Sequence, residues 1–177
     1  PNELQAILYL ILKISNNHNR TPFFFDKIEK ILLYIKSNIK RTFTNYQIFS
    51  IFKSNKRILL FLIKQKILNL DEHIVKSMAK GKFLRYNYLS YFFPEIKTFL
   101  EEEKRKELEE SIDFDKYEEK RIIGENDSYI CELIRKDLID KFISYVNQKC
   151  ISLNTTIESS IFETNSLLLK KECSLIE

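Results

Sequence analysis

Glycine and proline are scarce in this chain of 177 residues, which contains two glycines, three prolines and no tryptophan. A glycine-rich loop that cradles phosphate is excluded, because Gly81 and Gly124 lie far apart and each stands alone. Long runs rich in Leu, Ile, Lys and Glu fill the chain instead, and such runs favour helices. The composition therefore predicts an all-α fold.

Histidine and cysteine are also few. His18 and His73 form no metal-ligand pattern with Cys131, Cys150 and Cys173, so we predict no metal site and no cofactor. An odd number of widely spaced cysteines indicates reduced thiols, and we expect an intracellular, cytoplasmic protein. The sequence offers no catalytic residues, and we expect that the chain is not an enzyme.

Apolar residues recur at helical spacing through the first part of the chain. Residues 4–12 are apolar on nearly all sides, which indicates a helix that is buried on most of its surface or that needs a further helix to cover it. The apolar run at residues 58–63 is broken by Lys64 and is too short to span a bilayer, so we expect no transmembrane segment and a central place for this helix. The predicted N-caps of the following helices are Thr21, Thr44, Asn55 and Asp71.

Two of these helices have a more detailed expectation. The helix that begins at Pro22 should bury a stripe of apolar residues, and a Tyr/Phe-rich helix should end at Pro94. Short polar joints between all the helices predict an array of antiparallel helical hairpins, similar to a solenoid. The predicted stripe consists of Phe24, Ile28, Ile31, Leu32, Ile35 and Ile39.

Charge divides the chain into two unlike parts. Residues 1–100 contain 17 Lys and Arg against 6 Asp and Glu, and residues 101–177 contain 12 against 19, so the net charges of +11 and −7 sum to +4. The basic part leaves open a domain that binds nucleic acid or an anionic membrane surface. Lysines that solvate the outer faces of helices are the preferred interpretation, because the charges are scattered. The basic and aromatic residues concerned are Lys53, Lys56, Arg57, Lys80, Lys82, Arg85, Tyr86 and Tyr88.

The composition changes again near residue 95. Residues 95–122 keep a helical period with a thin apolar face, which predicts one acidic connecting helix. The stretch 123–126 is the predicted domain boundary. We therefore expect a helical N-terminal domain at residues 1–123 and a second unit at residues 124–177.

The second unit has the most specific pattern. DSYICELIRKDLIDKFISYVNQKC (127–150) predicts two short helices, and an extended stretch and the start of another helix follow. Together with YFFPEIKTFLEEE (91–103) and SSIFETNSLLLKKECSLIE (159–177), it resembles the N-terminal helical region of a large family of protist ankyrin-repeat proteins. The resemblance implies that residues 124–177 are a divergent ankyrin-like repeat unit, truncated at its C-terminal end, with ankyrin repeats stacking after Glu177. It also implies a protein–protein interaction scaffold whose partner is unknown.

The second unit departs from a regular ankyrin repeat at its turns. Lys136-Asp137 and the stretch 148–150 stand where glycine is expected, and residues other than glycine are strained in the left-handed backbone conformation of such turns. A repeat of this kind buries its core only by stacking on a neighbour, so we expect exposed apolar surface at residues 151–177. The sequence does not identify partner-binding residues.

Overall fold

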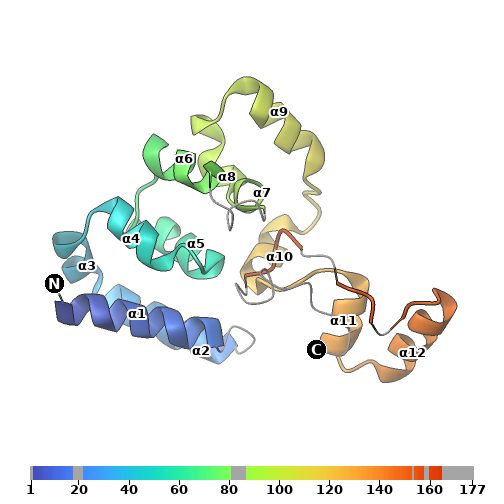
Figure 1. The fold of residues 1–177 in the computed structure, drawn as a ribbon. Helices are drawn as coiled ribbons and strands as arrows, with labels where there is room; N and C mark the ends of the chain where they lie inside the picture. The colour runs from blue at the N-terminus through green and yellow to red at the C-terminus, as the bar shows by residue number, and fades with distance from the viewer. Residues whose placement is uncertain (1, 18–21, 81–86, 153, 158–159, 165–177) are drawn as a thin grey trace.

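The computed structural model describes residues 2–17, 22–80, 87–152, 154–157 and 160–164. These residues form helices and connecting turns, which confirms the all-α class (Figure 1). The helices are α1 (Asn2–Asn17), α2 (Pro22–Tyr34), α3 (Lys36–Thr42), α4 (Asn45–Phe52), α5 (Lys56–Lys64), α6 (Glu72–Lys80), α7 (Tyr88–Tyr91), α8 (Phe93–Ile96), the short 3-10 helix η1 (Lys97–Phe99), α9 (Glu102–Ser111), α10 (Tyr117–Ile123), α11 (Tyr129–Arg135) and α12 (Ile139–Gln148).

Three of the four predicted N-caps are confirmed. The Thr44 hydroxyl accepts a hydrogen bond from the Gln47 N–H, and the Gln47 side chain accepts one from the Thr44 N–H. These two hydrogen bonds form a capping box at the start of α4. The side chains of Asn55 and Asp71 accept from the N–H three residues later, at 3.0 and 2.8 Å. The predicted cap at Thr21 lies outside the described residues. These caps fix where α4, α5 and α6 begin.

Helix α5 lies at the centre of the main core, as its apolar run predicts. Its residues Ile58, Leu59, Leu60 and Leu62 are buried, and apolar residues from α1 to α8 pack around them. A second, smaller cluster lies beside this core and includes residues of α8, α9 and α10. The second cluster consists of Phe93, Leu108, Ile112, Tyr117 and Phe162.

The stripe predicted for the helix from Pro22 is only partly correct. Ile31 is 46% exposed, and Phe25, which the stripe omitted, is buried. The helix divides into α2 and α3 at Ile35, although backbone hydrogen bonds continue across the division. The core covers one side of this helix, so only part of the stripe is buried. The predicted residues that are buried are Ile28, Leu32 and Ile39.

Two other helix boundaries are wrong in the sequence prediction. Pro94 does not end the aromatic helix but lies in the first turn of α8, where its missing N–H leaves no hydrogen bond unmade. The single acidic helix predicted at 95–122 is interrupted between α9 and α10. There the Asp113 carboxylate accepts a hydrogen bond from the Asp115 N–H at 2.9 Å, and Lys116 has a φ of 52°. A local side-chain bond of this kind competes with the helix.

Candidate interaction surface

Helices α11 and α12 form a pair that buries very little of its own surface. Figure 1 shows the pair at the opposite end of the view from α1 and α2. Leu133 is the one buried residue of α11, and none of the residues of α12 is buried. The two helices therefore contribute almost nothing to the cores described above.

Apolar side chains lie exposed on this pair. Ile139 and Ile143 are 60% and 51% exposed and stand four residues apart on α12, so they share one face of the helix. Ile134 is 48% exposed at the end of α11, and Leu138 is exposed in the turn between the helices. Single exposed apolar residues are ordinary, but a group of them indicates an interaction site. We call Ile134, Leu138, Ile139 and Ile143 the α11–α12 apolar face.

Both helices of the pair end in the same kind of turn. One residue adopts a left-handed conformation, its N–H bonds the carbonyl three residues back, and the next N–H bonds the carbonyl five residues back. This is a Schellman motif, in which glycine is the usual left-handed residue. Here that position is taken by Asp137 (φ 53°) after α11 and by Cys150 (φ 51°) after α12, and Lys66 plays the same part after α5. The turns at Asp137 and Cys150 are left-handed where the sequence predicts it.

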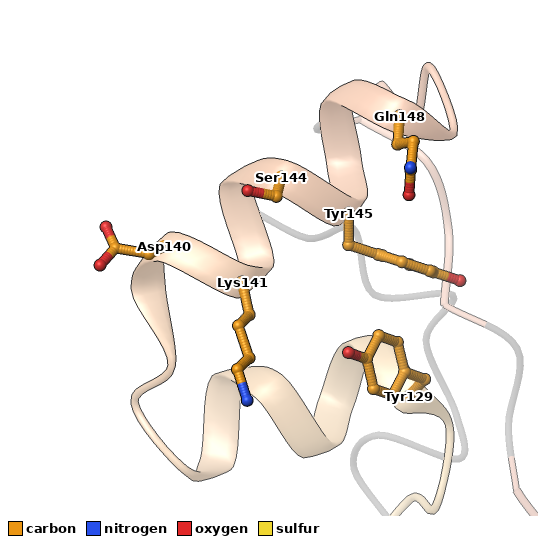
Figure 2. Close-up of a pocket in the computed structure, with 6 residues that line it drawn as sticks. All are labelled: Tyr129, Asp140, Lys141, Ser144, Tyr145 and Gln148. Carbon is orange, nitrogen blue, oxygen red and sulfur yellow. The ribbon is translucent and has the colours of Figure 1, made fainter.

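A shallow groove of about 280 Å³ lies along one side of the pair (Figure 2). The rings of Tyr129 and Tyr145 meet edge to face across it, with centroids 4.9 Å apart. The groove offers neither a histidine nor a cysteine, which are common general bases and nucleophiles. The other lining residues are Asp140, Lys141, Ser144 and Gln148.

A second group of apolar side chains is exposed at the N-terminal end. In α1, Leu8 and Ile11 are buried, whereas Ile7, Tyr9 and Leu10 are exposed. The expectation of a helix buried on most of its surface is therefore wrong. The alternative expectation, that a further helix covers α1, fits this exposure.

The apolar surface predicted to be exposed at residues 151–177 is not exposed in the described part of that stretch. Phe162 is only 3% exposed and meets the ring of Tyr117 edge to face, with centroids 5.5 Å apart. Glu163 and Thr164 are also buried. Residues 165–177 lie outside the described residues. The exposed apolar residues near this end of the described chain lie on α11 and α12 instead.

Several described basic residues of the first part interact with other parts of the chain. The Nζ atoms of Lys36 and Lys40 donate to main-chain carbonyls just after α5, at 2.7 and 3.2 Å, where a helix end favours positive charge. Arg57 lies over the ring of Phe25 at 3.7 Å, and Lys64 pairs with a glutamate of α10 at 3.2 Å. These four cations are therefore engaged within the chain.

The basic and aromatic residues considered for anion binding are spread over several environments. Lys53 and Lys80 are exposed, whereas Lys56 and Tyr88 are buried. The Tyr88 hydroxyl donates to the Lys53 carbonyl. The remaining candidates, Lys82, Arg85 and Tyr86, lie outside the described residues.

Two cations, Lys56 and Arg121, are buried, and the sequence did not predict their burial. The Lys56 side chain donates to the Ile161 carbonyl at 3.0 Å and lies 5.4 and 5.3 Å from the ring centres of Tyr88 and Tyr91. Desolvation lowers the pKa of Lys56 to about 7, although the nearby Glu163 opposes this shift. Lys56 follows an N-cap and precedes the apolar run of α5, and this position is the one sequence signal that could have predicted its burial.

The other buried cation is Arg121 in α10. It pairs with Glu95 at 2.7 Å and with Glu118 at 2.6 Å, and the Tyr91 hydroxyl donates to its carbonyl. Desolvation opposes the charged form of Arg121, but the hydrogen bond and charge of Glu95 outweigh it, so the pKa of Arg121 is raised. The cation is therefore held as part of the packing between α8 and α10.

The histidine and cysteine residues do not form a site in the described part of the chain. His73 lies on α6 with its ring 4.5 Å from that of Tyr46, and His18 and Cys173 are outside the described residues. Cys131 and Cys150 are free thiols. Across the described ranges, no group of three metal-ligating side chains occurs and no helix is long and apolar enough to cross a membrane.

Comparison with protein families, with curated proteins and with solved structures finds no match for this chain. A function must therefore be argued from its own surfaces, which include the α11–α12 apolar face and the exposed apolar residues of α1.

Proposed function

We propose that this chain is a non-catalytic protein–protein interaction module and that the α11–α12 apolar face is its contact surface. The observation that carries the proposal is a helix pair that buries one residue, Leu133, and leaves the large apolar side chains of the α11–α12 apolar face exposed. A helix normally buries its apolar stripe against another element. The missing element is supplied by a neighbouring helical layer.

The size of the apolar face supports such a contact. Burying a whole Leu or Ile side chain contributes about 1.5–3 kcal/mol, so covering four that are roughly half exposed contributes about 3–6 kcal/mol. Binding has costs in entropy that offset part of this gain, and polar contacts at the groove of Figure 2 would add to it. This gain suits a helical repeat that stacks within one polypeptide, because a tethered layer loses less entropy on docking.

The turns support the assignment of this unit as a divergent ankyrin-like repeat. Asp137 and Cys150 adopt left-handed turns where glycine is usual, which is the conformation that the resemblance leads us to expect there. In this proposal residues 124–177 are the first repeat-like unit of a solenoid, and ankyrin repeats stack after Glu177. The free thiols of Cys131 and Cys150 fit a reducing compartment, and we propose the cytoplasm.

A matched pair of variants on α12 tests the surface. Ile143→Asp places a charge on the apolar face, and Ser144→Asp places the same charge one residue away on the groove side. The chain together with its downstream sequence is used to capture partners from nuclease-treated lysate, with washes at low and high salt. We expect Ile143→Asp to reduce capture at least tenfold and Ser144→Asp to reduce it less than threefold.

Photo-cross-linking then locates the contact. A photoreactive residue at position 143 should cross-link to the captured partner or to the downstream repeats, and one at the exposed Lys97 should not. Equal cross-linking from both positions would rule out the α11–α12 apolar face. Capture that is lost after nuclease or high salt would instead support the alternative of an anion-binding domain.

A further inference from the structure

Residues 160–164, with the sequence SIFET, return to the first part of the fold after the α11–α12 pair. Figure 1 shows this segment, in red, beside α10. It is a tight turn, because the Glu163 N–H donates to the Ser160 carbonyl at 3.2 Å and the Phe162 N–H donates to the Ser160 hydroxyl at 3.1 Å. We call residues 160–164 the SIFET turn.

The turn is held at its centre by one aromatic side chain. Phe162 is buried in the second cluster, against Tyr117. The Lys120 ammonium lies 5.6 Å from the centre of the same ring. The phenyl ring is therefore positioned by an aromatic ring on one side and by a cation nearby.

Hydrogen bonds to main-chain groups of the turn hold it on both sides of that ring. Lys56 donates to the Ile161 carbonyl at 3.0 Å, and the Gly124 carbonyl accepts from both the N–H and the hydroxyl of Thr164, at 3.1 and 2.7 Å. A Cβ atom at Gly124 would lie 3.1 Å from the Thr164 side chain, so the absence of a side chain there leaves room for the turn. Ser160 adds a hydrogen bond to Asp127.

This combination is how proteins recognise short peptides. Hydrogen bonds to the main chain give affinity, and a pocket for one side chain gives specificity. Residues 154–156 of the connection from α12 are exposed, so they can be replaced without removing a buried side chain. The hydrogen bonds and the ring contact given above come from the turn itself.

We propose that Lys56, Tyr117, Lys120 and Gly124 form a binding site for a peptide turn with the pattern Ser-x-Phe-x-Thr, which the SIFET turn occupies within the same chain. A peptide with this pattern on another molecule binds there when the chain's own turn is released. The site lies on α5 and α10 and is independent of the function proposed for the α11–α12 apolar face.

The experiment separates the turn from its tether without altering the site. A specific protease sequence replaces residues 154–156, and a fluorescent peptide with the sequence of residues 157–164 (IESSIFET) is added before and after cleavage. Tethering gives the chain's own turn an effective concentration on the order of millimolar, so the uncut chain should bind the peptide about 100-fold more weakly than the cut chain. A peptide with alanine in place of the phenylalanine should bind the cut chain at least tenfold more weakly.

A second variant tests the proposal without cleavage, in case the cleaved chain unfolds. The uncut Phe162→Ala chain keeps its covalent integrity but leaves the ring position empty, and it should bind the IESSIFET peptide more tightly than the uncut wild-type chain does. Failure of the peptide to bind to both the cut chain and the Phe162→Ala chain overturns the proposal. Equal binding of the alanine-substituted peptide overturns it as well, because the ring would then carry no recognition.

Discussion

Replacing Lys56 with methionine should remove a distinctive dependence of stability on pH. The Lys56 side chain is fully buried, and desolvation, opposed by Glu163, lowers its pKa to about 7. In the unfolded chain a lysine titrates near pH 10.4. Methionine has a similar length and no titratable group, so the Lys56→Met variant isolates the contribution of this one amine.

The sign and size of the effect follow from proton binding. Between about pH 7 and pH 10 the unfolded chain holds a proton on Lys56 that the folded chain has largely lost, so stability rises with pH. The slope approaches about 1.4 kcal/mol per pH unit, which amounts to roughly 4 kcal/mol across this window. Below pH 7 both states are increasingly protonated and the contribution levels off.

Urea unfolding at pH 6, 7, 8, 9 and 10 measures this contribution. The free energy of unfolding of the wild type minus that of Lys56→Met should be nearly constant below pH 7 and rise above it. Burial raises the pKa values of Tyr88 and Tyr91, which lowers stability above pH 10, but both proteins contain these residues and the difference removes them. Lys76→Met, at an exposed position of α6, serves as the control and should stay within about 0.5 kcal/mol of the wild type.

A difference that does not change with pH would refute this reasoning. It would mean that the amine of Lys56 keeps an ordinary pKa in the folded chain and therefore reaches water. The SIFET turn could not then cover it in the way that the hydrogen bond to Ile161 requires.

Two further predictions concern backbone strain and buried charge. Asp137→Gly should raise the free energy of unfolding by about 0.5 kcal/mol, because relief of the left-handed strain exceeds the entropy cost of glycine. The control Lys141→Gly, inside α12, should lower the free energy of unfolding by about 1 kcal/mol. Thermal unfolding of the two variants and the wild type measures both effects. Destabilisation by Asp137→Gly would contradict the strain argument. Glu95→Gln should lower the free energy of unfolding by about 3 kcal/mol, because it removes a charge partner of the buried Arg121. Glu118→Gln, at the more exposed partner, should lower the free energy of unfolding by less than about 1 kcal/mol. Equal costs in urea unfolding would mean that Arg121 is not buried against Glu95.

Local features of this fold could be predicted because their causes lie within a few residues. The caps at Thr44, Asn55 and Asp71 each depend on a bond to the third residue along. The left-handed turns at Asp137 and Cys150 follow from where the two short helices must end. The exposed apolar surface was predicted at residues 151–177, whereas the exposed apolar residues of the described chain near this end lie on α11 and α12.

Features that depend on distant neighbours could not be predicted in this way. The break between α9 and α10 lets Tyr117 and Arg121 pack against α7 and α8, and helical periodicity carries no information about that contact. Whether an apolar side chain is covered depends equally on which helices pack over it, as the exposure of Ile31 and Ile143 shows.

The sequence by itself determined the all-α class, the starts of α4, α5 and α6 and the apolar run of α5, because each follows from composition, spacing or a bond to a near neighbour. Only the tertiary structure decided that Lys56 is buried and that it holds the Ile161 carbonyl, 105 residues away along the chain. The physical reason is that burial and charge pairing depend on which segments contact one another, and a local sequence pattern carries no information about contacts between distant segments.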